Sequence, residues 1–550
     1  MEMLPKSPAT AVLSAAIVWT FVRYLQMLRV GRKYAAHQHM IVSEETLLLR
    51  LFLPGGVSIP GVVYGGDHAF RAKYSVPPEF SRAGKDAYMQ VAMTNLRPNV
   101  YIADPQAIKV IATQKQRYVK DVEYLDQFIG HYGQSLAMVE GEVWKRQRKE
   151  TQRAFNEKNI RLVWSETEDI MRSLFKIWDN QGHKEVRVEN ATDVTETLAL
   201  LVISMAGFGR RTNWDPKEDK VPEGRQMSFS NALRTVSKNL IFRALIPTWA
   251  NNLTKKTRDV TTAFSEFGAY LTNMVGLGRK SSEITSEQLQ DGHQTQLAPD
   301  SLFNILLSAN DENMEDEKKG LDDREVAGNI FLFLFAGHET TAHTLSFCLG
   351  LLALYPETQQ EVYVQIEQFM KLHGRLDYSK LNDINLVECV FWESLRMYPV
   401  VTHIAKVATK DSVVSVARNG SSTNEDIRED FFIPEGANVW LSITAVHYNP
   451  TYWPEPEKFR PKRFLEPYNK DAFLAFSTGP RSCIGRRFAE IEGIVALAML
   501  IERYEIKIDE EEFLSVPGES ALEREARLLE PMQEATIAPI RVPLVFKRRY

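Results

Sequence analysis

The chain has 550 residues, of which 44% are hydrophobic, and this length is sufficient to bury a large core. The formal net charge is only -5, so the overall charge argues against a general attraction to nucleic acid. Its three cysteines, Cys348, Cys389 and Cys483, are too few and too far apart to favour a disulfide framework or a cysteine-rich zinc site.

The first predicted element is an apolar segment near the amino terminus. Ala9 to Val22 contains no charged residue, and extending it to roughly 20 residues, the length that crosses a bilayer, brings it to about Leu28. Arg23 would then reach toward the interface, and more basic residues follow the segment than precede it. The sequence therefore predicts a single membrane anchor within residues 1–35, with the downstream domain in the cytoplasm. The alternative is a cleaved signal peptide, against which the scarcity of cysteine argues.

Residues 36–69 form the next predicted region. Leu47 to Tyr64 is apolar but is interrupted by Arg50, Pro54 and Pro60, so it favours a segment on the membrane surface and not a span. We expect this region to connect the anchor to one domain that covers residues 70–550.

That domain begins with short β elements and continues as a large helical body. Val91 to Ile102 alternates as strands do, and Asp104 then opens a helix. From Gly141 to about Trp249 the apolar residues recur every three or four positions, which is typical of helices. Two polar stretches, Ser281 to Pro299 and Asp311 to Lys319, are interpreted as solvated loops.

The longest helical pattern begins at Asp322 and continues to about Tyr355. Asp322 and Glu325 have the spacing of an N-cap residue and the acid that completes a capping box. Ile330 to Phe335 is apolar on all sides, which predicts a helix buried inside the domain.

The most informative segment runs from Phe476 to Gly485 and reads FSTGPRSCIG. Two glycines bracket Cys483, so the backbone can turn and direct N–H groups at the sulfur. A helix predicted from Arg486 to Ile501 would stabilise a thiolate at its start, and Arg481 is placed to meet a carboxylate. The alternative for an isolated cysteine before a helix is a buried structural residue.

The pattern FxxGxRxCxG resembles the haem-binding loop of the cytochrome P450 family, and further family motifs follow in order over about residues 70 to 545. The resemblance implies a mainly α (α+β) fold, a helical prism with a small β-rich portion. It also implies haem b, whose iron is held by Cys483, with Phe476, Arg481 and Gly485 contributing to the haem site.

The segment Ala336, Gly337, His338, Glu339 and Thr340 resembles the family's oxygen-activation motif, AGx(D/E)T. This resemblance implies that the small pair leaves room beside the haem and that Glu339 and Thr340 are the catalytic residues that deliver protons. The alternative for Thr340 is a hydroxyl bonded back to the preceding helical turn. His338, like His343 further on, falls on no ligand position of the pattern and is interpreted as structural.

Two weaker motifs concern ion pairs and haem contacts. Glu393 and Arg396 share a helix face and resemble the family's ExxR pair, which Arg463 would complete as a structural group. Trp144 and Arg148 resemble the family's WxxxR on the helix that reaches the haem propionates.

Basic residues surround that second motif, and the third propionate contact is open. Lys145, Arg146, Lys149 and Arg153 form a basic patch, which is either a solvated face or, as the family resemblance implies, docks an acidic reductase together with Arg486 or Arg487. Where many relatives have an arginine ahead of the haem loop this chain has Lys406, and His403 and His447 are further candidates for the contact.

The family resemblance implies a membrane-anchored monooxygenase of the endoplasmic reticulum that resembles fungal microsomal enzymes of secondary metabolism. It implies insertion of one oxygen atom from O2 into a terpenoid, sterol, fatty acid or polyketide, with electrons from NADPH. A separate NADPH-cytochrome reductase, with cytochrome b5 as a further candidate, must supply them, because the chain has no nucleotide fingerprint of its own.

Candidate substrate-cavity residues are Phe331 to Phe335, Val400 to Ile404 and Val122 to Ser135, whose apolar character suits a lipophilic molecule. The sequence leaves two other hypotheses open. One is a reductase-independent haem-thiolate isomerase or dehydratase, and the other is a membrane protein that binds haem or lipid without turnover.

Overall fold

The computed structural model describes residues 8–34, 40–42, 80, 83–91, 96–210, 213–215, 218–281, 302–311, 320–418, 427–533 and 535–550. The predicted membrane-surface segment from Leu47 to Tyr64 lies outside the described residues. So do nearly all of the two predicted polar loops, of which only Ser281 and Asp311 are described, each at a helix end.

The chain forms two compact units. The first unit, which holds residues 1–121, 402–456 and 469–482, contains the larger sheet. Its described elements are α1 (Pro8–Tyr34), β1 (Met40–Val42), β2 (Ala87–Val91), β3 (Pro98–Ile102), α5 (Pro105–Thr113), β4 (Tyr118–Val119), β6 (His403–Ala408), β7 (Ser412–Ala417), β8 (Arg428–Ile433), β9 (Asn438–Ser442), α17 (Ile443–His447), and the short helices η5 (Lys470–Ala472) and η6 (Gly479–Arg481).

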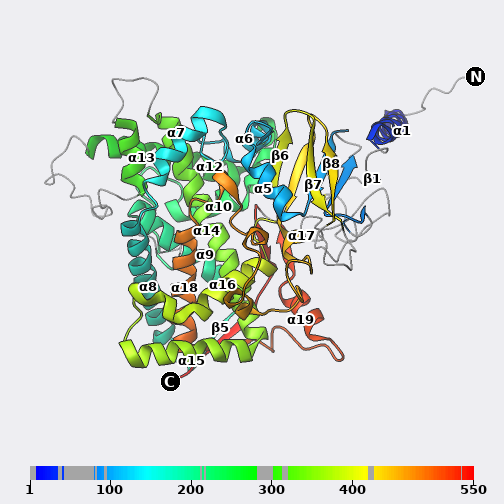
Figure 1. The fold of residues 1–550 in the computed structure, drawn as a ribbon. Helices are drawn as coiled ribbons and strands as arrows, with labels where there is room; N and C mark the ends of the chain where they lie inside the picture. Colours follow the sequence, from blue (N-terminus) through cyan, green and yellow to red (C-terminus); the bar gives the residue numbers. More distant parts are fainter. Residues whose placement is uncertain are drawn as a thin grey trace, which may run out of the picture. The chain divides into compact units, whose positions relative to one another are not determined.

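The first unit is organised around a six-stranded sheet in the order β1-β2-β3-β9-β6-β4, and β7 and β8 form a separate hairpin (Figure 1). The predicted strands within Val91 to Ile102 are confirmed in part, because β2 ends at Val91 and β3 begins at Pro98. Asp104 caps α5 as predicted, since its carboxylate accepts a hydrogen bond of 2.7 Å from the Ala107 N–H.

The second unit, which holds residues 122–401, 457–468 and 483–550, is mainly helical. Its described elements are α6 (Val122–Ile129), α7 (Gly141–Gln152), α8 (Glu157–Asn180), β5 (Glu185–Val188), α9 (Ala191–Val202), the π-helix η1 (Ile203–Gly207), α10 (Phe229–Lys238), α11 (Leu240–Leu245), η2 (Thr248–Ala250), α12 (Lys255–Ser281), α13 (Leu302–Asp311), α14 (Asp323–Leu354), α15 (Pro356–His373), η3 (Tyr378–Ile384), α16 (Asn385–Met397), η4 (Pro461–Leu465), α18 (Arg486–Arg503), β10 (Tyr504–Ile508), α19 (Ala521–Leu528), β11 (Pro531–Gln533), β12 (Ile537–Pro539) and β13 (Leu544–Arg548).

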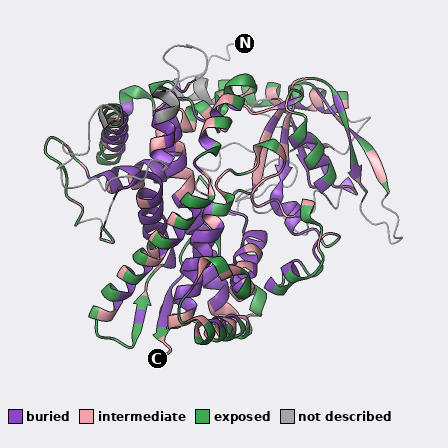
Figure 2. Ribbon diagram, turned by 60° about the vertical axis from the view of Figure 1, so that its left-hand side comes forward, coloured by how far each residue is buried: buried purple, intermediate pink, exposed green. Residues whose placement is uncertain are grey.

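The helix α14 is the interior element of this unit, and α9, α16 and α18 pack against it (Figure 1). Figure 2 shows the inner helices buried along most of their length, whereas the peripheral helices keep one exposed face. The prediction of a long buried helix is confirmed, because 22 of the 32 residues of α14 are buried. The mainly α fold with a small β portion is also confirmed.

The start of α14 is tied to the elements before it. The Leu136 N–H donates to the Asn329 side-chain oxygen at 3.0 Å, and Asn329 also bonds Gln147 of α7 at 3.2 Å. Gly133 and Gly328 approach each other so closely that a Cβ on Gly328 would lie 2.6 Å from the Gly133 carbonyl oxygen. The segment before α7 therefore lies directly on the backbone of α14.

The predicted anchor region forms the helix α1, whose described side chains include several exposed large apolar groups. Within the residues that the structure describes, no helix combines the length and the apolarity that crossing a membrane requires. The structure therefore does not support the predicted membrane span within residues 1–35.

The predicted capping box at the start of α14 is present, and its removal is testable. The Glu325 N–H donates to Asp322 Oδ1 at 2.8 Å, and the Asp322 N–H donates to Glu325 Oε2 at 3.1 Å. Asp322→Ala should lower the free energy of unfolding by about 1 kcal/mol, because an N-terminal N–H loses its partner. Urea denaturation measures this change. Asp322→Asn, which can still cap, should lose less, and equal losses in the two variants would contradict the capping role.

Candidate active site

Cys483 lies between η6 and α18 and differs from the other two cysteines in accessibility. Its side chain is exposed, whereas Cys348 and Cys389 are buried. Burial raises the pKa of Cys348 and of Cys389 to about 12, so both remain neutral thiols. Among the three cysteines, Cys483 is the one that can present sulfur to a ligand.

The surroundings of the Cys483 sulfur contain both an N–H donor and positive charge. Although the sulfur can be reached from outside, dense protein around it raises the pKa of the thiol by desolvation. The Gly485 N–H, which donates to the sulfur, and the charges of Arg148 and Arg486 act in the opposite direction. The predicted N–H donor is confirmed, and a thiolate bound to a metal ion would be stabilised by these groups.

Glycine is needed at Gly479 and at Gly485 of the loop for different reasons. Gly479 has a φ of +70°, which side chains rarely adopt, and a Cβ there would also lie 3.4 Å from Ala112. Gly485 has no positive φ, and a Cβ there would lie 4.0 Å from the Cys483 sulfur. Gly485 therefore leaves the space beside the sulfur clear.

Phe476 and Arg481 belong to the first unit, whereas Cys483 and Gly485 belong to the second. Arg481 ends η6, and both Phe476 and Arg481 are partly exposed. Phe476 and Arg481 are seven and two positions before the cysteine, respectively.

The helix α7 carries the predicted WxxxR residues on its inner side. Trp144 is buried and Arg148 is partly exposed, and the charges of Arg148 and Cys483 interact. Desolvation by burial lowers the pKa of Arg148, and the neighbouring sulfur offsets part of this change. Arg148 therefore lies on the cysteine side of the site.

The predicted basic patch is only partly free to meet a partner. The Arg146 guanidinium donates hydrogen bonds to Glu325 and to the Gly320 carbonyl oxygen, so Arg146 binds the start of α14 and is not free to meet a partner. Arg486 pairs with the buried Glu490 at 2.8 Å. Lys149 remains exposed on α7.

The middle of α14 has an accessible side and a buried side. Ala336, Gly337 and Thr340 are partly exposed, although they lie in the centre of a buried helix, whereas His338 and Glu339 are buried. A helix in the interior shows such exposure only where it borders an opening. The small residues and the threonine hydroxyl are therefore on the open side.

The Thr340 hydroxyl bonds back to the preceding turn of its helix, which is the alternative that the sequence left open. Thr340 Oγ1 donates to the Ala336 carbonyl oxygen at 2.8 Å, as a hydroxyl in a buried helix commonly does. Gly337 has a packing reason to be small, because a Cβ there would lie 3.1 Å from Ile203 Cγ1 of the π-helix η1. The Thr340 hydrogen bond and the packing at Gly337 are both compatible with the predicted catalytic roles.

Phe155 links the cysteine loop to α14 and was not predicted from the sequence. A Cβ on Gly485 would lie 3.8 Å from its ring, and the centre of that ring is 5.7 Å from the centre of the Phe333 ring. No motif marks this position, because a lone phenylalanine between two helices is ordinary core sequence.

The ExxR group is a buried ionic triad. Glu393 accepts hydrogen bonds from Arg396 at 2.8 and 2.9 Å and from Arg463 Nε at 2.9 Å. The Arg460 N–H donates to the same carboxylate at 2.9 Å. Desolvation lowers the pKa of Arg463, and the charge of Glu393 raises it. The predicted pairing of these residues is confirmed, and it joins α16 to η4.

The alternative propionate candidates lie in the first unit. The His447 ring accepts a hydrogen bond of 2.9 Å from the Leu474 N–H and stacks on Phe473, which gives it a packing role. Lys406 is buried on β6. His403 lies 3.2 Å from the Thr402 hydroxyl.

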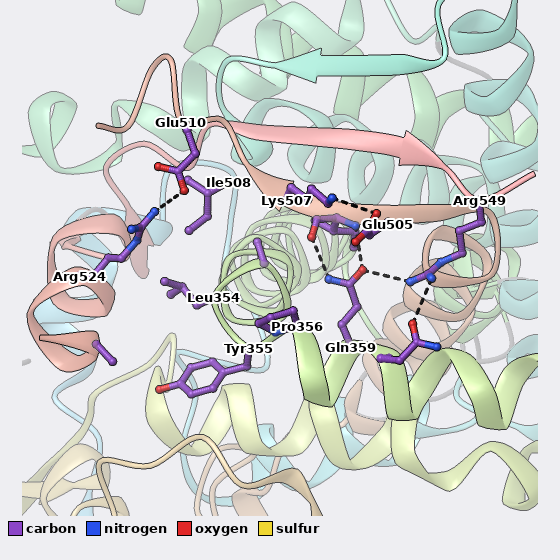
Figure 3. A pocket seen from close by; sticks show the side chains of 14 residues that line it. Leu354, Tyr355, Pro356, Gln359, Glu505, Lys507, Ile508, Glu510, Arg524 and Arg549 are labelled. Carbon is purple, nitrogen blue, oxygen red and sulfur yellow. Dashed lines mark hydrogen bonds and ion pairs between the residues drawn. The ribbon is translucent and has the colours of Figure 1, made fainter. Parts of the chain in front are cut away.

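A cleft of about 560 Å³ lies elsewhere in the second unit, between the end of α14, α15, β10 and α19 (Figure 3). Gln359 bonds the Ile506 backbone at its wall, and Arg524 pairs with Glu510 (Figure 3). The residues that line it include none of those predicted to contact haem or substrate. We therefore assign the cleft no part in the predicted chemistry.

The chain's own residues fit a haem bound through sulfur. An accessible cysteine receives an N–H bond from Gly485 and faces the charge of Arg148, and α14 borders an opening with small residues and a hydroxyl. Such a donor set is suited to an iron–thiolate bond and not to a nitrogen-rich metal site. These features fit the haem-thiolate class of enzymes.

Comparison with known proteins agrees with this class of enzyme. The sequence model of the family named Cytochrome P450 matches residues 85–524. Cytochrome P450 monooxygenase 124 of Postia placenta is 36% identical over 499 residues, which cover 90% of this chain and 91% of that protein. Cytochrome P450 monooxygenase ORF6 of Penicillium roqueforti is 26% identical, with 74% of each chain covered, and Cytochrome P450 3A31 of Mesocricetus auratus is 28% identical, with 69% of this chain and 71% of the relative covered.

The chain therefore belongs to the cytochrome P450 family. It is an oxidoreductase of the monooxygenase type, and the family implies a haem-thiolate cofactor, dioxygen and an organic substrate.

The buried triad gives a testable prediction. Glu393→Gln should lower the free energy of unfolding by about 3–5 kcal/mol, because two buried guanidinium groups lose their carboxylate. Chemical denaturation of the variant measures this loss. Glu367→Gln, which removes an exposed carboxylate paired with Lys371 at 2.8 Å, is the control and should leave the free energy of unfolding nearly unchanged, because solvent screens an exposed pair. Similar losses in the two variants would contradict a structural role for the triad.

Proposed function

We propose that the protein inserts one oxygen atom from O2 into a lipophilic small molecule, with haem b bound through Cys483. The observation that carries this proposal is the accessible Cys483 sulfur with the Gly485 N–H and the charge of Arg148 beside it. The single domain predicted for residues 70–550 is part of the same proposal.

The cysteine side would hold the cofactor. Haem b with a thiolate ligand supplies the chemistry of O–O bond cleavage. Gly485 and Arg148 stabilise the anionic form of Cys483, and Arg148, Arg481 and Trp144 would bind the propionates.

The α14 side would supply space and protons. Ala336 and Gly337 present little side-chain bulk on the open side of α14. The Thr340 hydroxyl, now bonded to the Ala336 carbonyl oxygen, can turn its proton outward, and Glu339 would replace that proton.

Aromatic side chains on the same helix support a lipophilic substrate. The Phe331 and Phe335 rings are 5.8 Å apart between centres, and Tyr132 packs edge-on against Phe331 at 4.9 Å. Phe331 is buried and Phe335 is partly exposed, and this aromatic cluster suits the terpenoid, sterol, fatty acid or polyketide substrates of secondary metabolism without selecting one of them.

Electrons would come from NADPH through a separate NADPH-cytochrome reductase, with cytochrome b5 as a further donor. Lys145, Lys149 and Arg153 are exposed on and just after α7, and Arg486 and Arg487 are exposed at the start of α18 near Cys483. Their positive charge favours an acidic partner on the cysteine side.

Membrane attachment at the endoplasmic reticulum, with the catalytic domain in the cytoplasm, would use α1. Its exposed large apolar side chains are Ile17, Val18, Trp19, Phe21, Val22, Tyr24 and Leu25. Basic residues at Arg29, Arg32 and Lys33 would meet anionic lipid heads.

The ligand assignment predicts a spectroscopic result. Cys483→Ser should abolish the strongly red-shifted absorption of the ferrous carbonyl complex, because the sulfur ligand is lost. Cys389→Ala, which changes a buried cysteine, should retain it. A red-shifted band that persists in the serine variant would refute the assignment of Cys483.

The catalytic role of Thr340 predicts uncoupling. Thr340→Ala should retain the carbonyl spectrum and reduce the product formed per NADPH consumed by on the order of 100-fold, the low end of general acid–base catalysis. Thr344→Ala is the matched control, since Thr344 also bonds back along α14, at 2.7 Å, but is buried. Parallel losses in the two variants would favour a purely structural role, and product without any reductase would favour an isomerase.

The membrane role of α1 predicts vesicle binding. Trp19→Glu combined with Phe21→Glu should reduce cosedimentation with vesicles of anionic phospholipid, because two charges replace two exposed apolar groups. Leu514→Glu, at an exposed leucine outside α1, should bind like the unchanged protein. Unaltered binding by the double variant would argue against attachment through α1.

A further inference from the structure

The contact between α9 and α14 contains a row of polar side chains. Thr192 Oγ1 lies 2.8 Å from Ser346 Oγ, and one turn further along α9 Glu196 Oε1 lies 3.8 Å from His343 Nε2. Later residues of α9 thus face earlier residues of α14, so the two helices run in opposite directions.

Glu339 belongs to the stripe of α14 that faces α9. It lies four residues before His343, and residues at this spacing are neighbours on one helix face. Glu339 is buried, whereas the adjacent Thr340 is partly exposed on the open side of α14. Glu339 can therefore donate a proton to Thr340. After that step Glu339 would have to be protonated again, from the interface with α9.

A series of ionisable groups leads from the protein surface into this interface. Lys238, at the end of α10, pairs with Glu196 Oε2 at 2.9 Å, and Glu196 faces His343 on its other side. The exposed fraction of the side chains falls from 48% at Lys238 to 9% at Glu196 and 0% at His343. His343 Nδ1 lies 2.7 Å from the Thr536 hydroxyl, so hydrogen-bonding groups flank both ring nitrogens.

The carboxylate of Glu196, which faces His343, carries a negative charge. Burial raises the pKa of Glu196, but His343 and Lys238 outweigh it and hold that pKa at about 2, so the carboxylate is ionised. Burial lowers the pKa of His338 to about 4, and this neighbouring ring stays neutral. The other ionisable groups that act on this cluster are Asp193 of α9 and Arg234 of α10.

We propose that His343, with Glu196 as its positioning residue, carries protons from the Lys238 end of the interface to Glu339. The ring takes a proton from water that reaches Glu196 and holds it on Nε2 beside the carboxylate. It then releases a proton to the Glu339 carboxylate one turn away, directly or through one water molecule. Only a proton moves from base to base, and no electrons are exchanged. The role rests on the proposed function, which consumes protons at Thr340.

Three variants test the route. Glu196→Gln keeps the shape and removes the charge, and His343→Asn can still bond Thr536 but cannot carry a proton. Thr192→Val is the matched control, because it breaks the other polar pair of the same interface. The first two variants should form on the order of 100-fold less product per NADPH consumed. They should also change the solvent isotope effect on turnover, whereas Thr192→Val should stay within about twofold of the unchanged protein.

A second measurement does not depend on turnover. In protein labelled with ¹⁵N-histidine, the ring signals that disappear in His343→Asn belong to His343. These signals should shift in Glu196→Gln and remain in place in Thr192→Val. Carbonyl spectra equal to that of the unchanged protein would show that the haem site is intact in each variant.

Unshifted ring signals in Glu196→Gln would overturn the proposal. Equal loss of coupling in all three variants would also overturn it, because the interface would then matter only as packing. If the unchanged protein turned over and Glu196→Gln matched it, the proton route would fail alone. If the unchanged protein formed no oxygenated product with any reductase, the proposed function would fail and the route with it.

Discussion

A 32-residue helix through the interior of the second unit places the strictest physical constraint on this protein. Bulk water cannot satisfy the buried polar side chains of α14, so each must find a partner inside the protein. Asn329 bonds α7 and the segment before it, His338 bonds its own helix at Leu334, and Ser346 bonds α9. The capping box fixes the point where this burial begins.

The same constraint separates the two predicted catalytic residues. Thr340 faces the open side of α14 and Glu339 is buried, although the two are adjacent in the sequence. A hydroxyl can serve a reacting molecule only from the open side, and a carboxyl group is kept away from bulk water on the other. Under the proposed function, the groups of α9 and α10 behind this buried side of the helix would supply its protons, and Glu196 and Lys238 are the ion-paired groups there.

Much of this arrangement can be predicted from the sequence because its signals are local. The capping box and the helix after Cys483 depend on residues a few positions apart, and both are present. The strands predicted within Val91 to Ile102 are present in part. The Glu393 triad was also predicted, although its third member is 70 residues away, because the family motif supplies that link. Accessibility of Cys483 could be inferred only from the resemblance.

Contacts between elements without a motif could not be predicted. Nothing in the sequence around Glu196 indicates that it faces His343, because the pairing depends on how α9 packs on α14. His343 was interpreted as structural because it falls on no ligand position of the family pattern, and Phe155 was not predicted because no motif marks it. Arg146 was assigned to a basic surface, yet it bonds Glu325, since the sequence does not reveal which way a helix turns its arginines.

The close approach of Gly133 to Gly328 restricts how this enzyme could be redesigned. The contact is between two backbones, and neither glycine has a side chain that a substitution could shorten. Shortening residues at this contact therefore cannot enlarge the interior of the protein. Under the proposed substrate position beside α14, room for bulkier molecules would come from shortening Tyr132 or Phe335, whose side chains are partly exposed.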